Sequence, residues 1–87
     1  MTKQQEEKIK NLIRTNQEAM NAFNKMLTFY EVFDKINFTT HSKLIRSIYL
    51  DKKSYYSWQL ANIANVGRSS SFLHRKQYIE CFYLCLN

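Results

Sequence analysis

The first part of the chain carries apolar residues at steps of three and four, the spacing that places side chains on one face of an α-helix. The stripe comprises Ile9, Leu12, Ile13, Met20, Phe23, Leu27, Tyr30 and Phe33, and no Gly or Pro interrupts it. Residues 1–36 therefore predict one long amphipathic helix, or a helix pair bent near Thr15, Asn16 and Gln17, where helical propensity is weak.

The same stripe also fits a coiled-coil seam. Ile9, Asn16, Phe23 and Tyr30 follow one another at intervals of seven residues, so they share one heptad position with a polar Asn inside it. The repeat lasts only about three heptads. We therefore expect the stripe to cover the rest of its own domain, and a homodimer through residues 9–33 is the alternative.

Residues 40–87 divide into shorter helical segments. Thr39 or Thr40 is the predicted N-cap of the first, because a hydroxyl can accept hydrogen bonds from the free amides of the first turn. Its predicted buried stripe is Leu44, Ile45, Ile48 and Tyr49. Residues 50–54 are polar and end the pattern.

Two further helices with a tight turn between them come next in the sequence. A short helix is predicted from about Trp58 to Asn65, and a last helix from Arg68 to about Leu86. Between them, Asn65 and Gly67 are residue types that tolerate positive φ, as a tight turn between helices requires. Ala61 is small enough for the predicted helix crossing, and Val66 is placed to fill the turn.

Composition agrees with an all-α fold. The chain has 87 residues, one Gly and no Pro, which leaves too few breakers for many short strands. We predict a single helical domain, 1–87, with four to five helices and a helix-turn-helix in its 40–87 part. No apolar run reaches the roughly 18 residues of a membrane span, and the N-terminus lacks an apolar signal stretch. No membrane contact and a cytoplasmic location in a bacterial host cell are therefore expected.

Charge is distributed unevenly along the chain. Residues 1–40 hold six basic and five acidic side chains, whereas residues 41–87 hold seven basic and two acidic ones, and the net charge is +6. A positive excess in one half is typical of a surface that neutralises phosphates and releases their counterions. The excess therefore favours a nucleic-acid partner for the C-terminal half.

The pattern from Ser57 to Ile79 predicts a DNA-binding helix-turn-helix, whose second helix enters a major groove with its N-terminal residues. Short polar and basic side chains there can bond base edges, and arginine pairs with guanine in bidentate fashion. The predicted base contacts are Arg68, Ser69, Ser70, Ser71, His74 and Arg75. The predicted contacts to the DNA backbone are Lys52, Lys53, Tyr56, Ser57 and Lys76.

The stretch from Ile48 to Phe72 resembles the C-terminal part of ArpU-type phage transcriptional regulators, which are similar to region 4 of sigma factors. Within it, Leu60-Ala61 matches the Ile-Ala pair of that family, Asn65 its turn residue and Val66 the following Ile. The resemblance covers roughly residues 44–80. It implies a helix-turn-helix opened by Arg68, Ser69 and Ser70, and a phage or prophage regulator that binds specific sequences of double-stranded DNA.

A second function class is suggested by the small size of the chain and by departures in the turn. Gly67 stands where the family has a Ser cap, and Ala64 is smaller than the family's Leu. The alternative is a small phage protein that binds a host protein, RNA polymerase or a CRISPR effector, and inhibits or redirects it. A basic face suits an acidic protein surface as well as DNA.

Other chemistry has weaker support in the sequence. Cys81 and Cys85, with His41 and His74, are potential zinc ligands; as an i, i+4 pair among apolar residues, the cysteines are more typical of buried small hydrophobes in a reducing compartment. No acid orients His74 and no glycine loop is present, so no enzymatic activity, cofactor or metal is expected. Tyr55, Tyr56 and Trp58 fit either base stacking on single strands or the core.

Overall fold

The computed structural model describes residues 2–51, 59, 62 and 73–87, together with the backbone of residues 68–72. Its helices are α1 (Thr2–Thr15), α2 (Gln17–Asn37), α3 (His41–Tyr49) and α5 (Arg68–Leu86), and Gln59 and Asn62 are also helical. Over these residues no strand occurs, so the predicted all-α fold is confirmed. None of the described helices combines the length and apolar character needed to cross a membrane.

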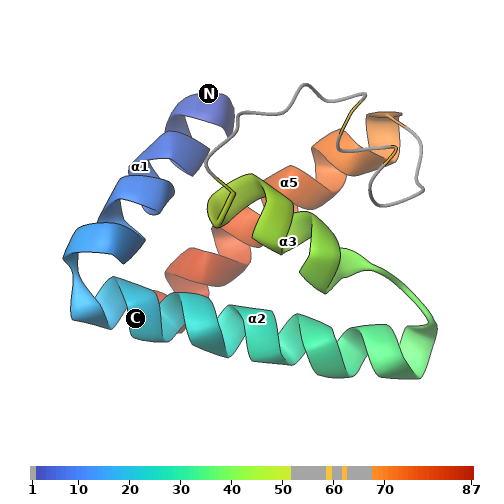
Figure 1. Cartoon of the computed structure of the whole chain (residues 1–87), viewed down its shortest axis with the longest axis horizontal. Helices are drawn as coiled ribbons and strands as arrows, with labels where there is room; N and C mark the ends of the chain where they lie inside the picture. The colour runs from blue at the N-terminus through green and yellow to red at the C-terminus, as the bar shows by residue number, and fades with distance from the viewer. Residues whose placement is uncertain (1, 52–58, 60–61, 63–67) are drawn as a thin grey trace.

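The long helix α2 organises the other elements. Figure 1 shows α1 rising from one end of α2, α3 lying across the middle, and α5 crossing behind. α2 packs against α1, α3 and α5, and its largest interface is with α5. Because α5 is held by this interface, α2 sets the position of the helix that the sequence predicts as the DNA reader.

The core of the described residues lies where α1, α2, α3 and α5 meet. Its largest fully buried side chains are Tyr78, Phe23, Phe82, Ile9, Met26, Leu44 and Ile45. The predicted stripe of α3 is buried as a whole, because Ile48 and Tyr49 are also less than a tenth exposed. Cys81 and Cys85 of α5 are half-buried at the edge of this core as free thiols.

The first 36 residues form the helix pair rather than the single rod. Asn16 leaves helical geometry with φ −134° and ψ 119°, and its side-chain oxygen accepts hydrogen bonds from the Glu18 and Ala19 amides at 2.9 and 3.2 Å. These are free donors of the first turn of α2, which an asparagine at the N-cap satisfies well. The weak propensity of residues 15–17 therefore marks a true helix boundary.

This boundary contradicts the continuous coiled-coil seam. Asn16 caps α2 instead of occupying a seam position, and α1 and α2 fold against each other. Ile9 and Phe23, two other members of the heptad position, are fully buried within the protein's own core. The stripe packs against other helices of the same chain. Most of the side chains proposed for a homodimer through residues 9–33 therefore lie in or against the protein's own core.

Asp34 near the end of α2 caps α3, a role that the sequence predicts for Thr39 or Thr40. Its carboxylate accepts hydrogen bonds from the His41 and Ser42 amides at 2.9 and 2.8 Å, and from the Thr39 and Ser42 hydroxyls at 2.6 and 2.7 Å. Thr40 occupies the N-cap position, but its side chain makes no capping bond. A carboxylate is stabilised there by the free amides and the helix dipole.

Replacing Asp34 by alanine is expected to destabilise the protein by about 1–3 kcal/mol, because two helix amides and two hydroxyls lose a charged acceptor. The measurement is urea unfolding followed by circular dichroism. Glu31→Ala is the matched control on the same helix, since Glu31 pairs with Arg46 at 2.9 Å on an exposed surface and should lose less than about 1 kcal/mol. Equal losses for the two variants would contradict the capping role.

Candidate nucleic-acid interface

Helix α5 contains all six of the predicted base contacts. It begins at Arg68, the residue at which the sequence predicts it to begin, and it runs unbroken to Leu86. Tyr78 and Phe82 anchor its C-terminal half in the core. The N-terminal end, which contains Arg68, Ser69, Ser70 and Ser71, lies at the periphery of the bundle (Figure 1).

Several predicted features lie outside the described residues. These are the backbone-contact candidates Lys52, Lys53, Tyr56 and Ser57, and the turn residues Ala61, Val66 and Gly67. The side chains of residues 68–72 are likewise outside the description. The helical state of Gln59 and Asn62 agrees with the predicted short helix at the two positions where it is described.

Arg75 does not face solvent, contrary to its prediction as a base contact. Its guanidinium donates hydrogen bonds from Nη2 and Nε to the two Glu6 carboxylate oxygens at 2.6 and 2.8 Å. Both side chains are less than a tenth exposed. This bidentate pair ties α1 to α5, and the Glu6 hydrogen bond raises the pKa of Arg75 further. Arg75 therefore joins helices in this structure and cannot reach a base edge.

His74, another predicted base contact, also packs against the rest of the protein. It is half-buried, and its ring packs edge-on against the His41 ring with centroids 4.7 Å apart. The His41 ring is hydrogen-bonded through Nδ1 to the Tyr78 hydroxyl, and Tyr30 packs beside it. The two histidines therefore link the start of α3 to α5 and support the N-terminal half of the predicted reading helix.

This histidine pair makes stability depend on pH. Burial and the neighbouring His74 lower the pKa of His41, outweighing the opposite effect of Asp34. A histidine whose folded pKa is below its unfolded value of 6.5 resists protonation in the fold, so the unfolded chain binds more protons and stability falls as pH drops through this value.

We expect urea unfolding to give a smaller free energy of unfolding at about pH 5.5 than at about pH 7.5. His74→Gln should reduce this difference, since it removes the neighbouring charge. Asp34 does not interfere: burial opposes the shift, but hydrogen bonds from Thr39, Ser42 and His41 outweigh it and lower the pKa of Asp34, so its carboxylate stays ionised at both pH values. Equal stability of the wild type at both pH values would contradict the role of the histidine pair.

Lys76, one of the predicted contacts to the DNA backbone, lies on the exposed face of α5. Leu73, Lys76, Gln77 and Glu80 are exposed there, and Ser69 precedes Leu73 and Lys76 at helical spacing. Lys76 is thus available to solvent, as a backbone contact must be. Lys76 therefore remains a candidate for a contact with phosphate, whereas Arg75 is no longer a candidate for a base contact.

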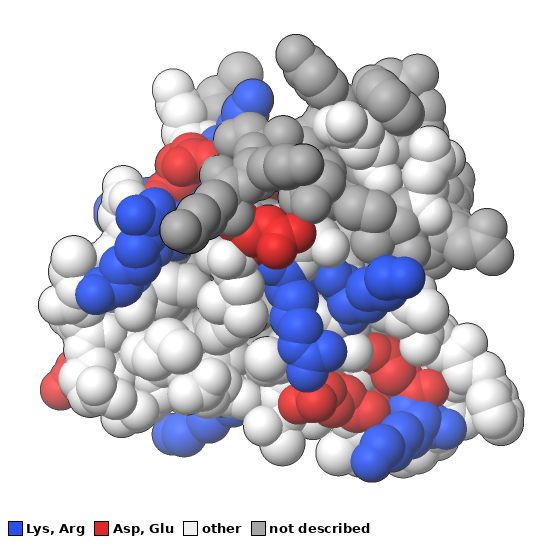
Figure 2. Space-filling model, viewed as in Figure 1, with Lys and Arg blue, Asp and Glu red and all other residues white. Residues whose placement is uncertain are grey.

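Basic side chains do not gather into one stripe on the face drawn in Figure 2, where blue and red groups alternate. Arg46 is bonded to Glu31 at 2.9 Å, whereas Lys43 is exposed. Mixed charge weakens sequence-independent attraction to a polyanion. On this face the described surface alone therefore gives modest electrostatic support for DNA binding.

The zinc alternative finds no support among the residues that the structure describes. They hold no group of three or more His, Cys, Asp or Glu side chains arranged for a metal ion, although both cysteines and both histidines are among them. Burial and the nearby Cys85 raise the pKa of Cys81 to about 11, so it is a protonated thiol at neutral pH. The cysteines fit the buried small hydrophobe interpretation.

Sequence reasoning missed an exposed apolar stripe on α2. Phe29, Val32 and Ile36 are 56%, 52% and 70% exposed, and Phe38 just beyond the helix is 94% exposed. Phe38 also has φ 56°, a left-handed geometry that is costly for a residue with a Cβ. The apolar residues in this half of α2 do have helical spacing in the sequence. They extend over a wide arc of the helix, so spacing alone does not show which part of the arc other helices cover; these residues are Phe29, Tyr30, Val32, Phe33 and Ile36. We call Phe29, Val32, Ile36 and Phe38 the outer stripe.

Comparisons with known proteins give no indication of function. No family model, no curated protein and no solved structure matches it.

Proposed function

We propose that the protein binds specific sequences of duplex DNA as a phage transcriptional regulator, with the N-terminal half of α5 in the major groove. The observation that carries this proposal is the start of α5 at Arg68, with Ser69, Ser70 and Ser71 in its first turn at the periphery of the bundle. Reading helices enter the major groove with their N-terminal residues.

The surrounding architecture suits such a helix. A reading helix must hold its position so that a few side chains meet base edges in register. The buried Glu6–Arg75 pair and the His41–His74 contact fix α5 from α1 and α3, next to its N-terminal half. In the proposed complex, Arg68, Ser69, Ser70 and Ser71 face bases, Lys76 contacts phosphate, and Arg75 and His74 position the helix.

The test is a fluorescence anisotropy titration of labelled duplexes with wild type and two variants. Arg68→Gln should weaken binding to the preferred duplex by roughly 5- to 150-fold and relax its sequence preference. Lys76→Gln should weaken binding to all duplexes alike, because phosphate contacts carry no sequence information. Lys25→Gln on α2, which removes an exposed charge far along the chain from α5, is the matched control. Equal affinity of Arg68→Gln and Lys25→Gln would contradict the proposal.

The outer stripe favours a second candidate, the binding of a host protein such as RNA polymerase or a CRISPR effector. Apolar side chains repeated on one exposed helix face are typical of helix surfaces that dock onto proteins. Phe29→Ser with Ile36→Ser should abolish capture of purified host RNA polymerase or effector, while Arg68→Gln leaves it intact. Loss of capture with Arg68→Gln alone would instead place the contact on α5.

A further inference from the structure

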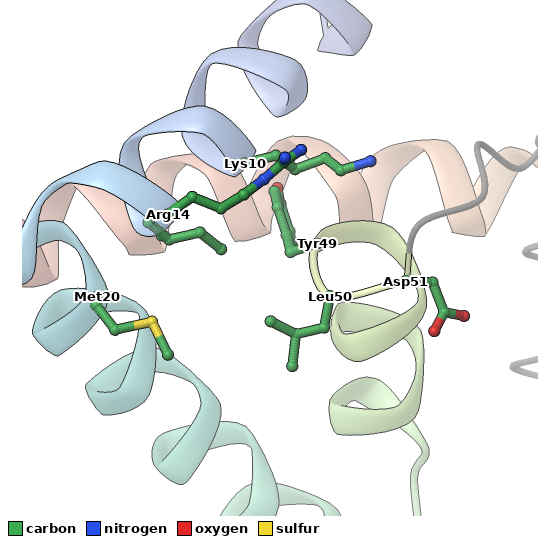
Figure 3. Close-up of a pocket in the computed structure, with 7 residues that line it drawn as sticks. Lys10, Arg14, Met20, Tyr49, Leu50 and Asp51 are labelled. Atoms are coloured by element: carbon green, nitrogen blue, oxygen red, sulfur yellow. The ribbon is translucent and has the colours of Figure 1, made fainter.

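The outer stripe lies on a side of α2 that the other helices leave open. At its start α2 borders α1 and the end of α3, where Met20 lines a pocket together with residues of both (Figure 3). Ile36 follows Met20 by 16 residues, which is about 160° around an α-helix. The outer stripe and this pocket are therefore on nearly opposite sides of α2, and each side chain of the stripe is more than half exposed.

A polar hollow of about 550 Å³ continues the same side of α2 toward its N-terminus. Lys25 of the hollow precedes Phe29 by one turn, and the stripe goes on from there at steps of three and four residues. From residue 21 to residue 38 this face is about 25 Å long, so it suits one partner helix lying along α2. The hollow is lined by Asn21, Asn24, Lys25 and Thr28.

Phe38 provides a second observation at the other end of the face. It has φ 56°, and its ring is 94% exposed. Glycine usually occupies this left-handed position after a helix, because a residue with a Cβ is strained there. Backbone strain of this kind is typical of sites that serve a function. The Phe38 ring gains burial only when a partner covers it.

The exposed charges of this face are positive. Lys25 and Lys35 are exposed, and within the described part of the chain neither has an ion-pair partner. The two acids of the same half of α2 are already engaged. Glu31 pairs with Arg46 at 2.9 Å, and Asp34 accepts the hydrogen bonds that begin α3. The face therefore complements a partner that carries negative charge.

The polar hollow offers hydrogen-bond donors for a carboxylate. Gln17 donates to the amide oxygen of Asn21 at 3.0 Å, which leaves the Asn21 amide nitrogen for a further acceptor. The Lys25 ammonium and the Thr28 hydroxyl line the same hollow. Hydrogen bonds from an ammonium to a carboxylate are stronger than those between neutral groups. An acidic side chain is the group that this set of donors matches.

A second copy of the chain complements this face less well. It brings the same two lysines, and its acid nearest the stripe, Glu31, is paired with Arg46. Glu18 is exposed but precedes Phe29 by 11 residues. When two stripes face each other in antiparallel fashion, Glu18 therefore lies beyond the end of the other α2. Charge favours an acidic partner from a different protein.

We propose that the face of α2 from residue 21 to residue 38 binds an acidic amphipathic helix of another protein. The apolar side chains of that helix pack on the outer stripe, and its carboxylates accept from Lys25 in the hollow and from Lys35 beside the stripe. The proposal rests on the second function above, protein docking through the outer stripe, and adds the chemistry of the partner. It shares no residue with the DNA-binding candidates on α5.

Two labelled peptides of about 18 residues, long enough to span the face, serve as probes. Both carry leucine at helical steps of three and four on one side, and they differ only in having glutamate or lysine beside that leucine stripe. Each is titrated with the full chain by fluorescence anisotropy at about 0.1 M salt. We expect the glutamate peptide to bind with a dissociation constant at or below about 100 μM, at least 10-fold more tightly than the lysine peptide.

Variants of the full chain assign the binding to this face. Lys25→Glu with Lys35→Glu should reverse the preference between the peptides, whereas Lys3→Glu with Lys8→Glu, which changes two exposed lysines of α1, should preserve it. Phe38→Gly should raise the urea midpoint of unfolding, because it relieves the strained position. The same variant should weaken the glutamate peptide by roughly 10-fold, because a ring at the contact is lost.

The outcomes separate the acidic partner from docking itself. Equal affinity for the two peptides, with both weakened by Phe29→Ser and Ile36→Ser, would overturn the acidic partner and leave docking through the outer stripe in place. No binding of either peptide up to about 1 mM would overturn both. The proposal also fails if sedimentation velocity shows a dimer of the wild type that these two serine substitutions abolish, since the occupant would then be a second copy.

Discussion

Glu6→Gln is expected to lower the free energy of unfolding by about 3–5 kcal/mol, because it removes the countercharge of a buried guanidinium. Glu6 and Arg75 are 4% and 7% exposed, and two hydrogen bonds of 2.6 and 2.8 Å join them. A domain of this size has only about 5–15 kcal/mol of stability in total. The variant should therefore unfold at a clearly lower urea concentration than the wild type.

Its neighbour provides the control. Glu7 pairs with Lys10 at 3.7 Å and is about half exposed, so Glu7→Gln should change stability by less than about 1 kcal/mol. The double variant Glu6→Leu with Arg75→Met should recover most of the loss, because replacing both buried charges leaves none unpaired. A loss for Glu6→Gln no larger than that for Glu7→Gln would show that the pair does not join α1 to α5.

Phe23→Ala is expected to cost a similarly large amount, about 3–5 kcal/mol, through lost burial and the cavity left behind. Phe23 is fully buried in α2, and its ring contacts Tyr49 edge-on with centroids 5.8 Å apart. The measurement is the midpoint of urea unfolding with the m-value held in common.

Phe29→Ala is the matched control for the same substitution on the same helix. Phe29 belongs to the outer stripe and is 56% exposed, so its removal should alter stability by about 0.5 kcal/mol or less. A strongly destabilised Phe29→Ala would mean that the outer stripe is covered within the protein itself. In that case it is not a surface for a host protein.

Local features of the fold could be predicted from the sequence. The boundary at Asn16 follows from weak propensity and a capping side chain, and the helical spacing of residues 68–86 agrees with α5. The stripe of α3 is buried as its spacing indicates. In each case the interactions that decide the structure join residues close together in the sequence, so the local sequence pattern is enough to predict it.

The candidate site was harder to predict, because its decisive contacts join distant parts of the chain. Arg75 and Glu6 are 69 residues apart, and His41 and Tyr78 are 37 apart. Helical periodicity places Arg75 on a face of α5 but does not tell whether that face meets DNA or another helix. Arginine serves both purposes, since its guanidinium pairs equally well with a buried carboxylate and a guanine.

Asp34 and the outer stripe show two other limits of the pattern. Asp34 caps α3 across seven and eight residues because α2 ends in a tight left-handed turn at Phe38, which the sequence does not mark with a glycine. The second half of α2 is apolar on several faces, so spacing could not separate the face covered by α3 and α5 from the exposed one.

The central claim, sequence-specific DNA binding, is tested most directly by titrating the purified protein against duplexes from its own genomic neighbourhood at about 50 and 200 mM salt. We predict that one duplex is bound far more tightly than the others and that this preference persists at the higher salt, because base contacts at α5 add to the phosphate contacts. Uniform weak binding that disappears at the higher salt, or no binding at either, would contradict it.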